Sequence, residues 1–76
     1  MDYVNVTAYL NNRYYGVMET FEGDYDEAMN VAWEWVNSGY YVECNDYNDV
    51  IRYNPDIMHR LLERYDYVEL SDCIDD

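Results

Sequence analysis

The sequence predicts a small α+β domain, with a mainly antiparallel sheet and two helices packed on one face of it. Residues 3–10 alternate between apolar and polar side chains, which is typical of a half-buried strand. Residues 25–38 and the stretch after Pro55 repeat apolar side chains at helical spacing. Shorter alternating stretches lie between and after these elements. The predicted order is therefore β-β-α-β-β-α-β, which favours a sheet covered by helices.

The first two strands are predicted to form a hairpin. Residues 11–13 are Asn-Asn-Arg, and asparagine tolerates the positive φ that tight turns require. Residues 14–21 then form the return strand, in which Gly16 marks a bulge or a close packing contact. One face of the first strand is expected to enter the core, and its side chains are Val4, Val6, Ala8 and Leu10.

The first helix is predicted over residues 25–38. Asp24 has the side chain of a helix N-cap, and Glu27 lies three positions later, as in a capping box. Gly39 is typical of the residue that follows a helix. Trp33 is expected at the edge of the apolar face. The centre of that face is formed by Ala28, Val31, Ala32, Trp35 and Val36.

The second half of the chain repeats this plan with weaker patterns. Residues 40–45 alternate as a third strand, the turn residues 46–49 follow, and residues 50–53 give the least distinct strand pattern. Asn54 is then expected to cap a second helix that has Pro55 at its first position.

The end of the chain is predicted to leave the domain. Residues 67–70 alternate weakly and are interpreted as a last strand. Because 76 residues are too few for two ordinary domains, residues 1–70 are assigned to one domain. Residues 71–76 are interpreted as an acidic C-terminal tail.

Charge is the strongest functional signal in the sequence. The chain has 17 acidic residues against four arginines, no lysine, and a net charge of −13. Such a chain is too acidic to bind DNA or RNA directly, since binding requires cations that displace counterions from phosphates. No apolar run is long enough for a membrane span, and the first residues do not read as a signal peptide. A cytoplasmic protein is therefore expected.

The composition also argues against a disordered acidic tail. Half of the residues are hydrophobic and 18% are aromatic, with eleven tyrosines. Three glycines and one proline are too few for a flexible linker. The carboxylates are thus expected on an ordered scaffold, where their positions are fixed.

Neither catalysis nor metal binding is predicted, and no cofactor is expected. Cys44, Cys73 and His59 do not have the spacing of zinc ligands. Cys44 is expected to be buried in its strand, and Cys73 to be exposed in the tail. With 17 acids in a short chain, a nearby pair of carboxylates carries almost no information about catalysis.

The acids on predicted turns and helix starts are the candidates for binding a partner. They would hold negative charge at fixed positions beside aromatic side chains. Aromatic residues are enriched in protein interfaces. For Asp24 and Glu27, a structural role in a capping box at the start of the helix explains the acidic side chains equally well. The predicted partner-binding residues are Glu22, Asp24, Asp26, Glu27, Glu34, Asp46 and Asp49.

In size, charge and the interleaving of Tyr, Asp and Glu, the chain resembles the small acidic DNA-mimic inhibitors that phages encode, including anti-restriction and anti-CRISPR proteins. The resemblance lies in residues 22–27, 43–49 and 66–76. It implies a non-enzymatic inhibitor in the host cytoplasm. Such an inhibitor would occupy the nucleic-acid-binding surface of a defence or host protein, such as a CRISPR effector or a restriction enzyme.

Other interpretations of the acidic surface stay open. It is also consistent with an acidic antitoxin that neutralises a basic toxin, or with a small homodimeric adaptor. A solvated surface that only keeps the protein soluble is a further alternative.

Overall fold

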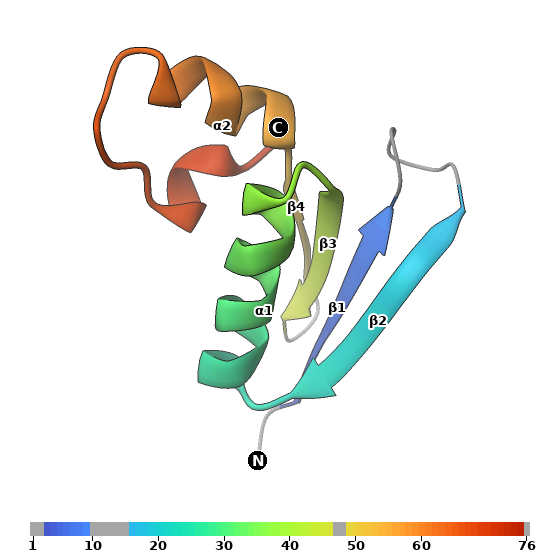
Figure 1. The fold of residues 1–76 in the computed structure, drawn as a ribbon. Helices are drawn as coiled ribbons and strands as arrows, with labels where there is room; N and C mark the ends of the chain where they lie inside the picture. Colours follow the sequence, from blue (N-terminus) through green and yellow to red (C-terminus); the bar gives the residue numbers. More distant parts are fainter. Residues whose placement is uncertain (1–2, 10–15, 47–48, 76) are drawn as a thin grey trace.

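Four strands form one antiparallel sheet in the order β2-β1-β3-β4 (Figure 1). The computed structural model describes residues 3–9, 16–46 and 49–75. The predicted turn 11–13 and Leu10 lie outside these residues. The strands are β1 (Val4–Tyr9), β2 (Val17–Gly23), β3 (Tyr41–Asp46) and β4 (Asp49–Tyr53). The α+β class and the order of its first six elements are therefore as predicted, including the fourth strand.

Two α-helices and one short 3₁₀ helix complete the fold. Helix α1 (Tyr25–Asn37) crosses one face of the sheet and contacts β1, β2 and β3. Helix α2 (Pro55–Leu62) lies past the end of α1 and packs against α1 and the 3₁₀ helix η1 (Leu70–Cys73) (Figure 1). In the described parts of the chain, no helix has the length and apolarity needed to cross a bilayer.

Local signals explain where α1 begins and ends. The Asp24 carboxylate accepts a hydrogen bond from the Glu27 backbone N–H at 2.9 Å, as an N-cap does. Ser38 caps the other end, and Gly39 follows it with φ +94°, a conformation that suits glycine. The helix therefore begins at the predicted residue and ends at Asn37, one residue before the predicted end.

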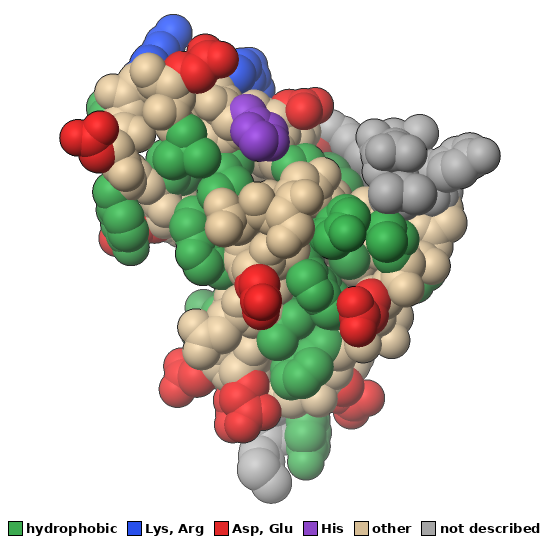
Figure 2. All heavy atoms as spheres, in the orientation of Figure 1, with side chains coloured by type: hydrophobic (Ala, Val, Ile, Leu, Met, Phe, Trp, Pro, Cys, Tyr) green, Lys and Arg blue, Asp and Glu red, His purple; other side chains and the backbone are tan. Residues whose placement is uncertain are grey.

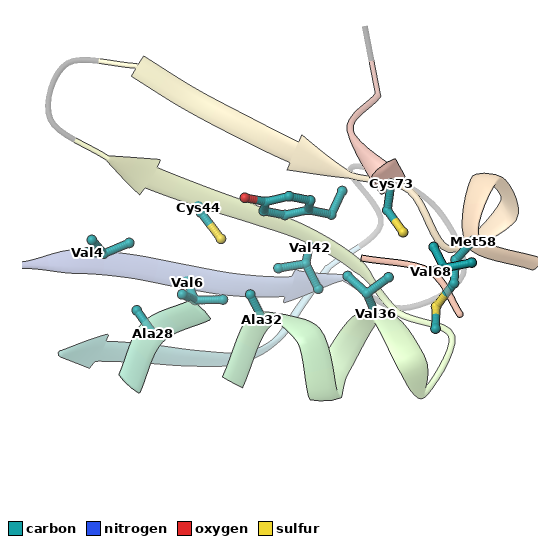
Figure 3. Packing of buried hydrophobic residues seen from close by; sticks show 11 residues of the cluster. Val4, Val6, Ala28, Ala32, Val36, Val42, Cys44, Met58, Val68 and Cys73 are labelled. Carbon is teal, nitrogen blue, oxygen red and sulfur yellow. The ribbon is translucent and has the colours of Figure 1, made fainter. Parts of the chain in front are cut away.

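The core lies between α1 and the sheet. The inward side chains of β1 are buried. Two of them, Val6 and Ala8, pair across the sheet with Cys44 and Val42 of β3. From α1, Ala28, Ala32 and Val36 face these strands (Figure 3). Small side chains on the helix allow a close approach to the valines of the sheet. Met58 of α2 and Val68 extend the same cluster beyond Val36.

The second strand differs from its prediction in position. It begins at Val17, and its pairing with β1 shifts between Ala8 and Tyr9, so that Met18 is an extra residue. The irregularity thus lies two residues after Gly16, which has φ +75°. Glu22 and Gly23 belong to the strand, because they pair with Asn5 and Val4.

The C-terminal segment, residues 67–75, differs from the prediction in two ways. The predicted strand over residues 67–70 is wrong, because η1 begins at Leu70 and Glu69 and Asp72 form a reciprocal capping box around its first turn. The end of the chain also packs against the domain in place of a separate tail. Ile74 forms a bridge to Tyr53, and the Asp75 N–H donates to the Arg52 carbonyl at 2.7 Å.

Cys73 explains why this segment packs inward. It was expected to be exposed, but its side chain is fully buried in the core cluster, as is that of Cys44. The burial of this side chain favours an ordered C-terminal segment. On the opposite face of the sheet, the Tyr41 hydroxyl donates to the Asp75 carboxylate at 3.3 Å and holds the same segment.

Candidate functional site

Six of the seven predicted partner-binding residues meet at one end of the sheet. Glu22 pairs with Asn5 in β1, and Asn5 pairs in turn with Asn45 in β3. The next residue pair of the β3–β4 hairpin is Asp46 with Asp49. The loop to α1 begins at this same end. We call the group the acidic end, and it consists of Glu22, Asp24, Asp26, Glu27, Asp46 and Asp49.

Strand spacing sets the width of the acidic end. Adjacent strands lie ~4.8 Å apart, so β2 and β4 at the two edges of this sheet are separated by about 14 Å. Over the same length, duplex DNA presents about eight phosphate charges, at one charge per ~1.7 Å of axis. The six acidic residues of the acidic end are thus comparable in number to the charges of a duplex segment of that length.

The start of α1 supplies half of these carboxylates. Asp24, Asp26 and Glu27 are exposed, although Asp24 also caps the helix. Carboxylates at a helix N-terminus are stabilised by the helix dipole, which offsets part of their mutual repulsion. The helix start thus tolerates three acids within four residues.

The β3–β4 hairpin supplies two more acids from a distant part of the sequence. Asp49 is the first residue of β4 and is exposed. Asp46 is the last residue of β3, and its side chain lies outside the described part of the structure. Antiparallel pairing of β1 with β3 brings this hairpin to the start of α1.

Glu34 is exposed but lies away from the acidic end. It follows Glu27 by seven residues on α1, which corresponds to two turns and a rise of about 10 Å. Its side chain therefore continues the same helical face. Glu34 extends the negative surface along α1 and is not part of the group at the sheet end.

The described arginines lie elsewhere on the molecule. Arg52 of β4 pairs with Glu43 of β3, with 3.5 Å between Nε and Oε1. Arg60 and Arg64 are exposed on α2 and just after it. In Figure 2 the basic side chains are at the end that carries α2, whereas several carboxylates surround the opposite end. Arg13 lies outside the described residues.

An aromatic groove, which sequence reasoning missed, separates α1 from the C-terminal segment. Its volume is about 520 Å³. Tyr25, Met29 and Trp33 form one wall from α1, and Tyr53 of β4 also lines it. The remaining lining residues are Asn30, Ile51, Tyr67, Val68, Glu69, Leu70, Ser71 and Ile74. The abundance of tyrosine in the sequence signals such a surface, but not which tyrosines meet.

The groups suited to metal binding or nucleophilic chemistry are dispersed. Within residues 3–9, 16–46 and 49–75, no three His, Cys, Asp or Glu side chains are grouped to hold a metal ion. Burial, and secondly the neighbouring Asp72 carboxylate, raise the pKa of the Cys73 thiol. The raised pKa lowers the fraction of reactive thiolate at neutral pH.

Comparison of the chain with protein-family models, with curated proteins and with solved structures yields no match.

Proposed function

We propose that this protein is a non-enzymatic inhibitor that binds the basic, nucleic-acid-binding surface of another protein in the cytoplasm and imitates DNA charge there. A CRISPR effector or a restriction enzyme is the type of partner that fits. The observation that carries the proposal is the acidic end. Two segments, residues 22–27 and 46–49, bring six acidic residues to one end of the sheet, while Arg60 and Arg64 lie at the α2 end.

Rigidity supports this proposal over a purely solubilising surface. The acids of the acidic end belong to strands, to a capped helix start and to a hairpin, so their backbone is fixed before binding. A pre-ordered charge array loses less conformational entropy on binding than a flexible acidic tail. Negative charge also accelerates encounter with a basic groove, an effect that salt weakens.

Competition with nucleic acid is the decisive test. The tagged protein is used to capture binding proteins from lysate of the source cell, first at low and then at high salt. A captured protein is purified and loaded with a fluorescent DNA or guide-RNA ligand of its own. We expect the protein to displace that ligand competitively, and the displacement to weaken steeply as salt rises.

Matched variants locate the binding surface. Neutralising Glu22 and Asp26 together, as Glu22→Gln and Asp26→Asn, is expected to weaken displacement about tenfold, or about 1.4 kcal/mol. The control neutralises Glu63 and Asp66, which are exposed beyond α2, by the same substitutions. Equal effects of the two pairs would mean that only net charge matters.

Two outcomes would overturn the proposal. One is a stable ternary complex in which the partner holds nucleic acid and this protein together at the same site. The other is an affinity that does not change with salt. Rescue of growth from a toxic protein that has no nucleic-acid groove would support an acidic antitoxin instead.

A further inference from the structure

The aromatic groove is built from three parts of the chain. Tyr25, Met29 and Trp33 are spaced by four residues on α1, so they lie on one face of that helix. Tyr53 contributes from β4, where its side chain is 4% exposed. The C-terminal segment contributes Tyr67 from the other side. The groove therefore depends on the packing of this segment against the domain.

The rims of the groove expose aromatic surface to solvent. Tyr25 is 52% exposed and Tyr67 is 75% exposed. Trp33 is half-buried and packs against the core. A stable fold gains little from tyrosines left this exposed, whereas a binding surface gains rigid, amphipathic contact area from them.

The charge of the groove identifies the class of its ligand. Among the described lining residues the charged one is Glu69, which is exposed. This carboxylate also takes part in the capping box of η1, and its negative charge would repel an anion and offer a purely apolar ligand no favourable contact. A cation is attracted both to the negative carboxylate and to the faces of the surrounding rings.

A second hollow, next to the aromatic groove, also combines an exposed tyrosine with an acidic residue. Its volume is about 420 Å³, and it shares Tyr67 and Val68 with the aromatic groove. Its lining also includes Tyr65, which is 58% exposed, and the carboxylate-bearing residue Asp72. Two neighbouring hollows thus each combine exposed tyrosine with an acidic residue.

We propose that the aromatic groove binds an arginine side chain of a cationic protein partner. Arginine fits better than lysine because its planar guanidinium stacks on aromatic rings, is weakly hydrated, and forms a fork of donors that matches a carboxylate. The net charge of −13 favours any such cationic segment. The inference rests on the proposed function for the identity of the partner, and it adds a second contact surface that begins beside the acidic end, at Tyr25.

A peptide titration tests the groove without any nucleic-acid-binding protein. The probe is acetyl-Gly-Arg-Gly-Arg-Gly-amide, added to isotope-labelled protein at 150 mM NaCl. We expect saturable NMR shifts of the Trp33 indole and of the backbone amides of residues 67–71. The same peptide with lysines should bind at least about threefold more weakly than the arginine peptide, and the peptide with neutral citrullines should not bind.

Substitutions at the rim separate the groove from general charge attraction. Replacing Tyr25 and Tyr67 together by leucine keeps apolar area but removes the aromatic faces, and should weaken binding of the arginine peptide at least threefold. The control is Tyr3→Leu, which changes a tyrosine that is 58% exposed and outside the groove. It should leave binding unchanged. Circular dichroism checks that both variants are folded.

Equal binding of the arginine and lysine peptides would overturn the inference, as would shifts confined to the acidic end. Equal loss in the groove and control variants would overturn it as well. Failure of the peptide to bind would refute the groove while leaving the competition with nucleic acid intact. Loss of that competition with normal peptide binding would refute the proposed function instead.

Discussion

At the scale of single residues, Asp24 has a role in the fold and a place on the proposed binding surface. Its carboxylate accepts the Glu27 N–H, and it is exposed at the acidic end. The sequence alone shows a cap at this position. It does not show that residues 46–49 come to the same end, since that depends on the pairing of β1 with β3.

Two substitutions at Asp24 separate these roles. Asp24→Asn keeps an oxygen that can accept the Glu27 N–H, so stability should be nearly unchanged while affinity for the basic partner falls. Asp24→Ala removes the cap as well, and should also lower the free energy of unfolding by about 1 kcal/mol. Urea unfolding and the displacement assay measure the two effects. Equal losses of stability in both variants would contradict the assigned cap.

Cys73 predicts a pH dependence of stability. Because the folded protein raises the pKa of this thiol, it keeps a proton that the unfolded chain loses. The free energy of unfolding therefore falls as pH rises from the unfolded to the folded pKa, and the loss is absent below that range. Between pH 8 and pH 10, we expect the free energy of unfolding of Cys73→Ala to fall less steeply than that of the native protein, as measured by urea unfolding.

A second variant controls for the other groups that titrate at high pH. Asp72→Asn removes the second cause of the shift, the nearby negative charge, and retains an oxygen for the bond from the Glu69 N–H. Its alkaline slope should lie between those of the native protein and Cys73→Ala. Identical slopes in all three proteins would show that the thiol does not contribute.

At the scale of elements, the strong periodicity of the sequence was enough to predict β1 and α1. Val4, Val6 and Ala8 alternate, and a cap and a terminal glycine frame the helix, so local and tertiary preferences agree. The weak alternation over residues 67–70 had no such support. There the reciprocal cap between Glu69 and Asp72 and the burial of Cys73 favour a 3₁₀ turn. The sequence shows the capping pair Glu69 and Asp72, but it does not show that Cys73 is buried.

Gly23 offers a test of how β2 meets α1. A Cβ atom at this buried position would lie 2.7 Å from Cε1 of Phe21 and 3.2 Å from Oε2 of Glu27. Gly23→Ala should therefore destabilise the protein by about 1–3 kcal/mol. Leucine at position 21 lacks the ring atoms that clash, so the cost should be smaller in the Phe21→Leu background. The same cost in both backgrounds would show that the clash is not its cause.

At the scale of the whole molecule, the net charge of −13 acts on stability as well as on binding. The radius of gyration is 11.8 Å, about one and a half times the Debye length of ~8 Å at physiological salt, so that salt screens the carboxylates from one another only in part. Many carboxylates therefore repel one another across the molecule. The acidic end concentrates part of that repulsion.

Added salt should consequently stabilise the fold. Between 10 and 300 mM NaCl we expect the free energy of unfolding in urea to rise on the order of 1 kcal/mol, because screening weakens the repulsion. The variant with Glu22→Gln and Asp26→Asn should show a smaller rise and a higher stability at low salt. A decrease of stability with salt would mean that attractive ion pairs, such as Arg52 with Glu43, dominate.

The aromatic groove belongs to the same scale, and the sequence could not predict it. Its walls come from residues 25–33, 51–53 and 67–74, which meet only in the folded molecule. Composition indicated a surface rich in tyrosine and acids. The register of the sheet and the return of the C-terminal segment decide which of these side chains become neighbours.

The position of β1 in the middle of the sheet also bears on how the chain folds. Asn5 pairs with Asn45, about 40 residues away, whereas β1–β2 and β3–β4 are hairpins that close locally. Closing the longer loop costs more conformational entropy. The hairpins are therefore expected to form before they meet, and their docking beneath α1 should limit the rate of folding. Substitutions where Ala8 meets Val42 should slow refolding, whereas those in β4 should mainly accelerate unfolding.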